Sequence, residues 1–424
     1  MIRGHLRSPG MASEEPQHKG KPMTDFEYMV IGKGLLGCAA THYLSQWSQH
    51  VAVLGPDEPA DFARHQGVFA SHYDQGRQTR LLSRSPIWSE INRQAMLNYP
   101  VLQAQSGMSF YRPVGALYAN ADRVTRGNPY RDYRRIAQEL EVAHEWYEPE
   151  DQSWREPFPD LDFPAGYSVL YEPAPAGYVN PRDYLRAELT LAEQHGAVAI
   201  RETAVDISQT AHAITIDTAE GNRYTAAKVL VAAGAFTNCH NLLPYPLDLP
   251  AKTETVILGE VSAADASRLE GYPTVLYRID DPDISDIYMT PPIQYPNGRF
   301  YIKMGCNTSA DSWPKTLEEM QAWFRDGDSN ACHDALCRAL DSLWPSVDIL
   351  ATETKRCMVC YTPSGHPSID RVEGALYVAT GGNGGGATGS DTLGRLAAGL
   401  VFDDRWPASI PRQPFRVQFL HSHR

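Results

Sequence analysis

The stretch that decides the fold is Phe26-Glu-Tyr-Met-Val-Ile-Gly-Lys-Gly-Leu-Leu-Gly37. Its apolar residues Tyr28–Ile31 predict a short buried strand, and three glycines follow with the spacing G-x-G-x-x-G. Residues 38–47 include Ala39, Ala40, Tyr43 and Leu44 and predict a helix, and His50–Leu54 predicts a second strand. This order of strand, turn, helix and strand is typical of a dinucleotide-binding βαβ unit.

Each glycine of this turn has its own expected role. Gly32 makes the tight turn, Gly34 lets the backbone approach a pyrophosphate, and Gly37 lets the helix pack on the strand. Leu35 and Leu36 follow the turn at the start of the helix. The N-terminal end of that helix carries the positive end of the helix dipole, so we expect it to face the phosphates.

The residue after the second strand favours FAD over NAD. In NAD-binding units an acidic residue usually stands there and binds a ribose hydroxyl. This chain has Gly55 at that place, with Asp57 and Glu58 close behind. Asp57 is therefore a candidate cofactor contact, and the missing acid disfavours NAD because FAD has many other anchors.

Length, charge and cysteine content limit the remaining possibilities. The chain has 424 residues, of which 42% are hydrophobic, so it has room for two or three domains with a substantial core. A net charge of −13 argues against nucleic acid or an anionic membrane surface as a partner. Among seven scattered cysteines, Cys357 and Cys360 form one Cys-x-x-Cys pair. The second half of a structural zinc site is missing, so no metal is expected.

Residues 1–24 are polar and contain no apolar segment typical of a secretory signal. We expect a disordered tail, or a stretch that lies upstream of a start at Met11 or Met23. No apolar run in the chain reaches the length of a membrane span. These features predict a cytoplasmic protein with reduced thiols, and they carry no signature of an oligomeric state.

The rest of the chain alternates between two kinds of pattern. Helices with apolar faces are predicted at residues 87–105, 130–141, 181–191, 317–324, 331–343 and 390–402. Buried strands are predicted at Lys228–Ala235 and Leu376–Thr380. Four further strands predict an antiparallel sheet, at residues 253–260, 274–278, 287–290 and 299–305. Strand–helix units at both ends and in the middle, with this sheet inserted, predict an α/β fold of two interleaved domains.

Seven segments carry a resemblance to a known family: Val30–Gly37, Thr79–Leu82, Tyr171–Gly177, Ala232–Asn238, Ile302–Gly305, Cys357–Asp370 and Gly381–Gly386. Each alone is a loose match, but their order and spacing are similar to those of FAD-dependent enzymes of the D-amino-acid oxidase (DAO) type. The chain most resembles the branch that contains monomeric sarcosine oxidase and N-methyltryptophan oxidase. The likeness extends over nearly the whole chain from Phe26 onwards.

The resemblance implies a Rossmann-like FAD-binding domain interleaved with an α+β substrate domain built on an antiparallel sheet. We expect the FAD-binding domain to comprise residues 25–85, 168–240 and 352–412, and the substrate domain residues 86–167 and 241–351. The resemblance also assigns cofactor contacts. These are Val205 at the adenine, Gly234 near the pyrophosphate, Arg80 beside the flavin, and the turn that approaches the flavin ring with Gly382, Gly384, Gly385, Gly386 and Thr388.

In the sarcosine oxidase branch a cysteine attaches the FAD covalently, and its position corresponds to Cys357 here. Cys360 is the alternative. The attachment needs a thiolate beside the flavin methyl group, and we expect Lys355 and Arg356 to lower the thiol pKa. Two structural thiols without any attachment are the other possibility, because free cysteine is often a small core residue.

Lys303 corresponds to a lysine that the branch uses to activate oxygen over the flavin. A cation beside the ring stabilises the superoxide that develops there. A lysine that simply faces solvent on a strand is the alternative. Lys303 and Arg80 are therefore the candidate catalytic residues.

The residues that bind a substrate carboxylate in the branch are replaced in this chain. Ser83 stands in place of an arginine, Thr388 in place of a lysine and Asn307 in place of a histidine. Either another arginine takes over, or the substrate is not a simple N-methyl amino acid. The available arginines are Arg77, Arg84 and Arg278, and the candidate substrate contacts are Arg84, Tyr288 and Asn307.

These observations lead to one principal hypothesis and three alternatives. The principal hypothesis is an FAD oxidase that converts the C–N bond of a secondary amine or amino acid to an imine, with O2 as acceptor and H2O2 as product. The alternatives are a flavin dehydrogenase of the same fold that passes electrons to a carrier, and a non-catalytic FAD-binding protein. An NAD-dependent dehydrogenase is supported only by the first glycine-rich turn.

Overall fold

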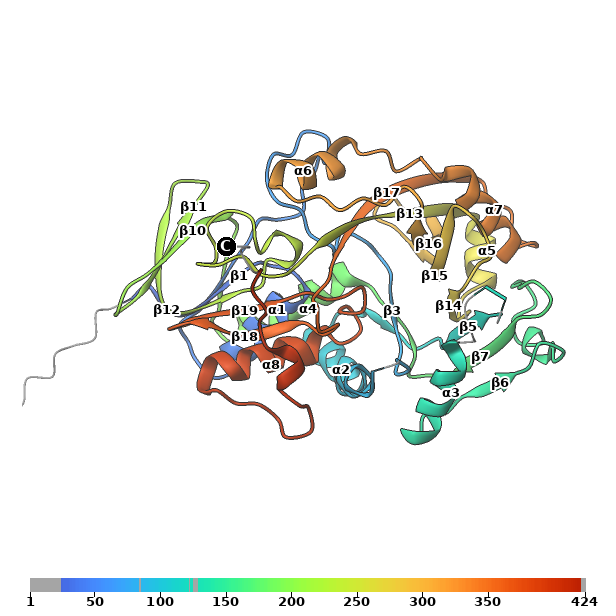
Figure 1. Cartoon of the computed structure of the whole chain (residues 1–424), viewed down its shortest axis with the longest axis horizontal. Helices are drawn as coiled ribbons and strands as arrows, with labels where there is room; N and C mark the ends of the chain where they lie inside the picture. Colours follow the sequence, from blue (N-terminus) through green and yellow to red (C-terminus); the bar gives the residue numbers. More distant parts are fainter. Residues whose placement is uncertain (1–23, 84, 122, 125–128, 421–424) are drawn as a thin grey trace, which may run out of the picture.

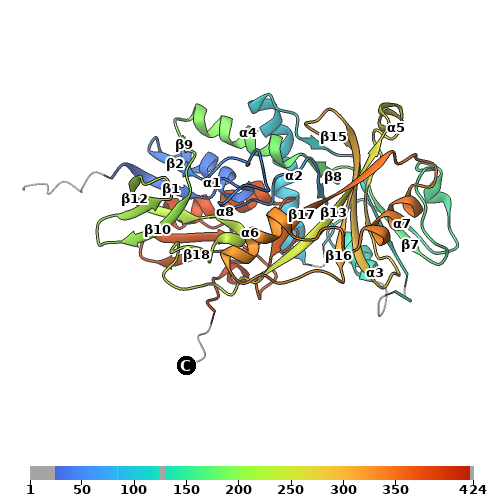
Figure 2. The ribbon, with the colours of Figure 1, turned by 90° about the horizontal axis from the view of Figure 1, so that it is seen from above.

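The computed structural model describes residues 24–83, 85–121, 123–124 and 129–420. The expected N-terminal tail, except for Thr24, and the side chain of Arg84 lie outside these ranges. The described chain forms two halves, each built on an eight-stranded sheet (Figure 1). The long strands β13 (Ala251–Val261) and β17 (Ala351–Cys360) lie side by side and extend from the second half towards the first (Figure 2). Among the described residues, no helix is long and apolar enough to span a bilayer.

The first half is a parallel sheet with short antiparallel additions. Its parallel strands lie in the order β9 (Val198–Ile200), β2 (Val51–Leu54), β1 (Phe26–Ile31), β12 (Arg223–Val231) and β19 (Leu376–Thr380). Three antiparallel strands extend this sheet: β10 (Ala204–Gln209), β11 (Ile214–Thr218) and β18 (Ser368–Glu373). Ile31 pairs with Leu54 on one side and with Val231 on the other. The continuous apolar runs of these strands reflect burial on both faces of the sheet.

Four helices belong to this half: α1 (Leu35–Ser45), α2 (Pro86–Ser106), α4 (Pro181–Gln194) and α8 (Ser390–Asp403). α1 packs on both α4 and α8, and α2 packs against the same two helices. The sequence explains the ends of α2. The side chain of Ser85 caps its first turn, Pro86 begins it, and Gly107 ends it with a φ of +71°.

The second half is a largely antiparallel sheet. Its order is β17, β13, β16 (Phe300–Thr308), β15 (Ile284–Gln294), β14 (Thr274–Tyr277), β5 (Ala116–Asn120), β7 (Ser168–Glu172) and β6 (Glu145–Tyr147). The helices of this half are α3 (Pro129–Glu139), α5 (Ala263–Arg268), α6 (Leu317–Asp326) and α7 (His333–Leu343). A third, small sheet consists of β3 (Arg77–Thr79), β8 (Gly177–Val179) and β4 (Tyr111–Arg112). The α/β class with an inserted antiparallel sheet is thus confirmed.

Three segments lie in the opposite half of the molecule from the one that the expected domain ranges give. β7 and β17 hydrogen-bond within the second sheet, although their residues fall in the ranges expected for FAD binding. α2 packs on helices of the first half, although its range was expected in the substrate domain. β17 was not predicted as a strand because Thr352–Lys355, in its first half, are polar and exposed or half-buried, so they lack an apolar signal.

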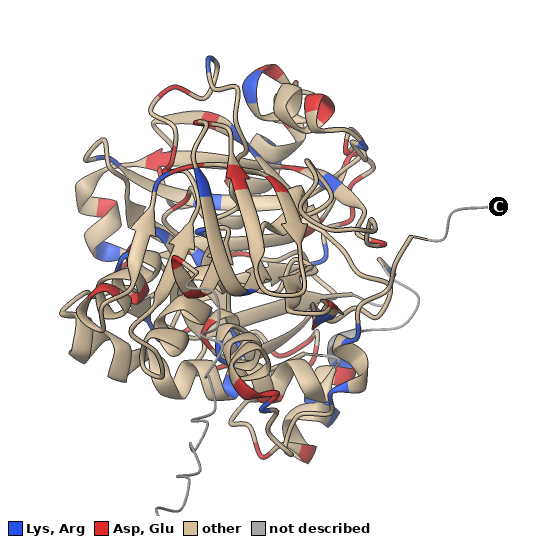
Figure 3. Cartoon of the chain, turned by 90° about the vertical axis from the view of Figure 1, so that its left-hand side faces the viewer, with Lys and Arg blue, Asp and Glu red and all other residues tan. Residues whose placement is uncertain are grey.

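Charged side chains of both signs are distributed over the molecule. On the side shown in Figure 3, blue Lys and Arg positions and red Asp and Glu positions are interspersed along the ribbon of helices and strands. The net charge of −13 remains the argument against a nucleic acid as a partner.

Candidate active site

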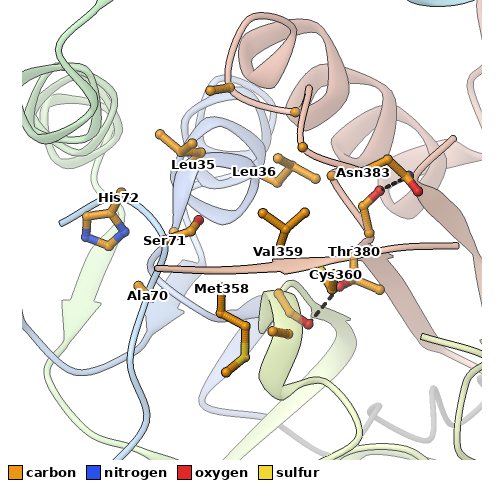
Figure 4. A pocket seen from close by; sticks show the side chains of 18 of the residues that line it. Leu35, Leu36, Ala70, Ser71, His72, Met358, Val359, Cys360, Thr380 and Asn383 are labelled. Atoms are coloured by element: carbon orange, nitrogen blue, oxygen red, sulfur yellow. Dashed lines mark hydrogen bonds between the residues drawn. The ribbon is translucent and has the colours of Figure 1, made fainter. Parts of the chain in front are cut away.

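A cavity of ≈ 570 Å³ lies between the two halves. Its walls combine segments that are far apart in the sequence: residues 31–36, 68–73, 232–236, 357–360, 379–388 and the inner face of the second sheet. In Figure 4, Leu35 and Leu36 at the start of α1 face Val359 on β17. The fold therefore brings the first glycine-rich turn, the late glycine run and the Cys-x-x-Cys strand to one place.

The three glycines of the first turn differ in their surroundings. A Cβ atom on Gly37 would lie 1.9 Å from the carbonyl oxygen of Gly32, and one on Gly32 would lie 2.4 Å from that of Ala232. A Cβ on Gly34 would meet no atom within 4 Å. Gly32 and Gly34 line the cavity, whereas Gly37 lies behind it. α1 also begins without a side-chain cap, so its first N–H groups are available to an anion on the cavity side.

Besides Gly37, the residues Asp57 and Val205 were expected at the cofactor and do not line the cavity. The carboxylate of Asp57 pairs with Lys33 and lies 3.3 Å from Arg201 Nε. Val205 lies in β10, where its carbonyl accepts a hydrogen bond from the backbone N–H of Asn241. The residues just before it, Thr203 and Ala204, line the cavity instead.

The late glycine run lines the cavity through Gly382, Gly384, Gly385 and Gly386. A Cβ on Gly385 or on Gly234, whose φ is +56°, would meet nothing within 4 Å. Thr388 ends the run, and its Oγ1 donates to the carbonyl of Gln78 at 2.9 Å. This hydrogen bond ties the run to the segment that carries Arg80, which also lines the cavity.

Both cysteines of the Cys-x-x-Cys pair line the cavity. Burial raises the pKa of each thiol above its ordinary value. The expectation that Lys355 and Arg356 lower the pKa of Cys357 is wrong. Arg356 lies on the opposite face of β17 and donates to the carbonyl of Gly327, and Lys355 Nζ lies 5.3 Å from the ring of Tyr295. The cation in contact with Cys357 is Arg77, whose Nη2 is 3.9 Å from Sγ, and Lys303 also lowers the pKa of this thiol.

Lys303 lies just behind the cavity wall. Its side chain is 1% exposed, and Nζ donates to the carbonyl of Gly76 at 2.7 Å and lies 2.6 Å from Asp74 Oδ2. Burial, together with the nearby Arg77, lowers the pKa of Lys303 to about 8, although Asp74 acts in the opposite direction. The same two cations hold the pKa of Asp74 well below its usual range in spite of its burial. The alternative of a lysine that faces solvent is excluded.

The substrate candidates Tyr288 and Asn307 line the cavity from neighbouring strands. Tyr288 lies opposite Gly305, and a Cβ atom on Gly305 would lie 2.2 Å from the ring of Tyr288. Asn307 donates to Asp286 Oδ2 at 2.7 Å, and Asp286 pairs with Arg278. Asp286 has a φ of +56° and sits in an irregularity between β15 and β16, which turns its side chain towards these partners.

Several cavity residues were not identified from the sequence. Glu254, Asp286 and His72 line the cavity, and Asp74 and Lys252 lie behind its wall. One local signal was available. Glu254 lies in the strand predicted at residues 253–260 and Lys252 directly precedes it, so an extension of that strand by one residue puts both on one face, as in β13. The other residues come together through contacts between distant segments, which no spacing reveals.

The cavity fits the expected FAD. Gly34, Gly234 and Gly385 leave open space at three places on its walls, and the uncapped start of α1 offers N–H groups to a pyrophosphate. His72 lines the cavity with a buried Nδ1 that has no hydrogen-bond partner among the described residues. Burial lowers the pKa of His72 to about 3, so the ring is a neutral partner for a ligand.

Comparisons with known proteins agree with this geometry. Monomeric sarcosine oxidase from Bacillus sp. (strain NS-129) is 25% identical over 390 residues, which cover 89% of this chain and 93% of that protein. N-methyl-L-tryptophan oxidase from Yersinia pestis (strain Pestoides F) is 25% identical over 227 residues, which cover 52% of this chain and 56% of that protein.

Solved structures show the same fold. NikD, described as an unusual amino acid oxidase essential for nikkomycin biosynthesis, superposes with a TM-score of 0.76 at 19% identity, covering 95% of this chain and all of that one. Glycine oxidase from Geobacillus kaustophilus gives a TM-score of 0.69 at 19% identity, covering 94% of this chain and 100% of that one. The family model described as FAD dependent oxidoreductase (DAO) matches residues 27–400. With the glycine-lined cavity and a match over nearly its whole length, this chain belongs to the DAO family of FAD-dependent oxidoreductases.

Proposed function

We propose that this protein oxidises the C–N bond of a secondary amine or amino acid to an imine, with O2 as acceptor and H2O2 as product. The observation that carries the proposal is the cavity of ≈ 570 Å³ between the glycine-rich walls and the antiparallel sheet. Relatives described as sarcosine oxidase and N-methyl-L-tryptophan oxidase support an amine as substrate. When bound, FAD accepts two electrons from the C–N bond and passes them to oxygen.

The two halves have separate roles in this proposal. The first half would hold the dinucleotide through Gly32, Gly34 and the start of α1, and the glycine run of residues 382–386 would supply the wall for the flavin. The second half supplies the substrate side through Tyr288 and Asn307, which line the cavity from β15 and β16. Arg80 and Thr388 lie where the two sets of walls meet.

We further propose that Cys357 attaches the FAD by a thioether to the flavin methyl carbon. The new S–C bond replaces an S–H and a C–H bond, and O2 takes up the two hydrogens and their electrons as H2O2. Cys357 lines the cavity, and Arg77, 3.9 Å from its sulfur, favours the thiolate. Cys360 lines the cavity as well and is the competing site.

One observation favours a flavin dehydrogenase as a second candidate. The ammonium of Lys303 contacts Asp74 and the carbonyl of Gly76, and neither Lys303 nor Asp74 lines the cavity. A cation whose charge is balanced by a carboxylate stabilises developing superoxide less than an unpaired one. Electrons would then leave faster to a carrier than to O2.

The test is anaerobic reduction of the FAD-loaded protein by a panel of secondary amines and N-methyl amino acids. Substrate-dependent loss of visible flavin absorbance, followed by rapid recovery and H2O2 formation on admission of O2, is the expected result. Loss of absorbance with slow recovery in O2 but fast recovery with an artificial acceptor would identify the dehydrogenase. If no amine reduced the flavin, the proposed reaction would be wrong and a non-catalytic FAD-binding protein would replace it.

A further inference from the structure

A buried carboxylate stands at the substrate side of the cavity. Glu254 lies in β13 directly opposite Cys357 in β17, so the two side chains share the cavity face of the sheet. Glu254 is 8% exposed and lines the cavity. Glu254 therefore lies beside Cys357, the proposed attachment point of the cofactor, and next to Tyr288, which also lines the cavity.

The described partners of this carboxylate lie at the long end of hydrogen-bonding distance. Lys252 Nζ lies 3.4 Å from Oε1, and the hydroxyl of Tyr288 donates to Oε2 at 3.4 Å. Both separations are long compared with a charge-assisted hydrogen bond. Lys252 is held more closely by other groups, since its Nζ is 2.8 Å from Asp311 Oδ2 and donates to Asn307 Oδ1 at 2.5 Å. A carboxylate accepts about four hydrogen bonds, so Glu254 retains acceptor capacity on its cavity side.

The burial and the charge of Glu254 indicate the chemistry of a ligand that would suit its carboxylate. A buried carboxylate without close donors is costly, and a ligand that brings N–H groups removes that cost. An amine that reaches the cavity from neutral water is an ammonium ion, which carries both the charge and the donors. Neutral amine is the form that the proposed oxidation needs, because the nitrogen lone pair must be free to form the imine.

We propose that Glu254 binds the protonated amino group of the substrate and accepts its proton. The step breaks one N–H bond and forms one O–H bond on the Glu254 carboxyl, and the freed electron pair stays on nitrogen. An ammonium–carboxylate pair thereby becomes a neutral amine and a neutral acid. This assignment rests on the proposed function and specifies its substrate class as amines that are cationic in solution.

The surroundings make Glu254 able to take this proton. Burial raises the pKa of Glu254 above its ordinary value, and Lys252 limits the increase. The titratable or charged groups that face it from the packed elements are Lys252, Asp311, Arg77, Cys357, Tyr288, Cys306 and Tyr361. An acid with a raised pKa is a better match to an amine than one that is fully exposed.

The first experiment measures binding with a ligand that cannot react. tert-Butylammonium has no hydrogen on the carbon next to nitrogen, so it binds without being oxidised, and tert-butanol is its neutral counterpart. Their affinities are read from the change in the flavin spectrum of the loaded protein, and from thermal shift of the same samples. In Glu254→Gln, tert-butylammonium should bind roughly tenfold to a hundredfold more weakly, whereas tert-butanol is unaffected.

Glu260→Gln is the matched control, because Glu260 lies in the same strand but pairs with Arg299 outside the cavity. Glu254→Asp keeps the charge and should restore part of the affinity. If Glu254→Gln fails to fold, the wild type still tests the assignment, since its affinity for tert-butylammonium should fall as the pH drops through the pKa of Glu254. Equal affinity in wild type and Glu254→Gln, or no pH dependence in the wild type, would overturn the proposal.

A second measurement separates this assignment from the proposed function. The substrate here is an amine that reduces the flavin. In Glu254→Gln, the rate of flavin reduction should rise with pH as the substrate amine loses its proton in solution. In the wild type, the rate should already be high at a lower pH, because Glu254 takes up that proton. If no amine reduces the flavin, the proposed function fails. The tert-butylammonium experiment still decides whether Glu254 binds a cationic nitrogen.

Discussion

Asp74 and Lys303 form an ion pair, 2.6 Å between Oδ2 and Nζ, behind the wall of the cavity. Arg77 shares the same carboxylate and lies 3.9 Å from the sulfur of Cys357. One buried carboxylate therefore connects the lysine expected to act on oxygen with the cysteine expected to hold the cofactor. A substitution of Asp74 should therefore alter both the reaction with O2 and the attachment of FAD.

The pKa of about 8 for Lys303 predicts how reaction with O2 depends on pH. The lysine is a cation below this value, so reoxidation of the reduced protein should slow as the pH rises through about 8. Asp74→Asn removes the group that raises the pKa of Lys303, so the decline should move to lower pH. Stopped-flow reoxidation over a pH series measures both profiles.

Lys303→Met should remove that pH dependence and slow reoxidation by on the order of 10²–10³-fold, comparable to the loss of one transition-state charge contact. Lys355→Met is the control, because Lys355 is 44% exposed and does not line the cavity. Unchanged reoxidation in Lys303→Met would show that this lysine has no role with oxygen.

Acid precipitation identifies the flavin attachment. Yellow colour should stay in the pellet of the wild-type protein and move to the supernatant in Cys357→Ser. Cys360→Ser should keep the colour in the pellet, because the thiol that Arg77 reaches is Cys357. Release by Cys360→Ser alone would assign the attachment to Cys360, and release from the wild type would mean that FAD is bound without a covalent bond.

The two glycines Gly34 and Gly37 should give opposite results when each is replaced by alanine. A Cβ on Gly37 would lie 1.9 Å from a backbone oxygen, so Gly37→Ala should lower the free energy of unfolding by about 1–3 kcal/mol or more. Gly34 has open space, so Gly34→Ala should fold normally and bind FAD more weakly. Urea unfolding of the FAD-free protein and fluorescence titration with FAD separate the two effects. Equal stability of both variants would contradict the packing role of Gly37.

Gly305 should control the position of the Tyr288 ring. Gly305→Ala places a Cβ 2.2 Å from that ring, so the ring must move. We expect KM for the amine to rise at least severalfold while the flavin spectrum without substrate stays unchanged. Tyr288→Phe keeps the ring and removes the hydroxyl, so it should affect KM less than Gly305→Ala does. A larger effect of Tyr288→Phe would assign the main role to the hydroxyl.

A buried carboxylate at the start of α8 predicts how stability depends on pH. Burial, and then the nearby Glu188, raises the pKa of Asp391 from 3.8 to about 7. The folded protein therefore holds a proton that the unfolded chain releases, and the free energy of unfolding should fall as the pH rises from about 4 to 7.

Asp391→Asn should flatten this dependence and raise the free energy of unfolding at pH 8 by a few kcal/mol. Asn keeps an acceptor for Tyr43 and Asn98, both of which donate to Oδ1 of Asp391. Asp403→Asn, at the exposed end of the same helix, serves as the control. Urea unfolding at several pH values is the measurement, and equal slopes for the three proteins would refute the assignment.

The sequence alone predicted the elements whose signals are local. The G-x-G-x-x-G turn, the apolar strand Leu376–Thr380 and the capped helix after Asn180 all depend on neighbouring residues, and the structure contains each of them. Steric and hydrogen-bonding rules act over a few residues there, so spacing is sufficient evidence. The family resemblance also led us to expect Cys357 and the glycine run of residues 382–386 at the flavin, and both line the same cavity.

Only the tertiary structure decided which charges meet. Arg356, next to Cys357 in sequence, donates to the carbonyl of Gly327, whereas Arg77, which is 280 positions away, reaches the sulfur of Cys357. Lys303 is in contact with Asp74, and Glu254 faces the cavity from a strand whose partners lie elsewhere in the chain. Side chains alternate between the two faces of a strand, and distant strands set what lies opposite each face. Sequence therefore determined the cofactor-binding elements, and the packing of distant strands determined the electrostatics of the site.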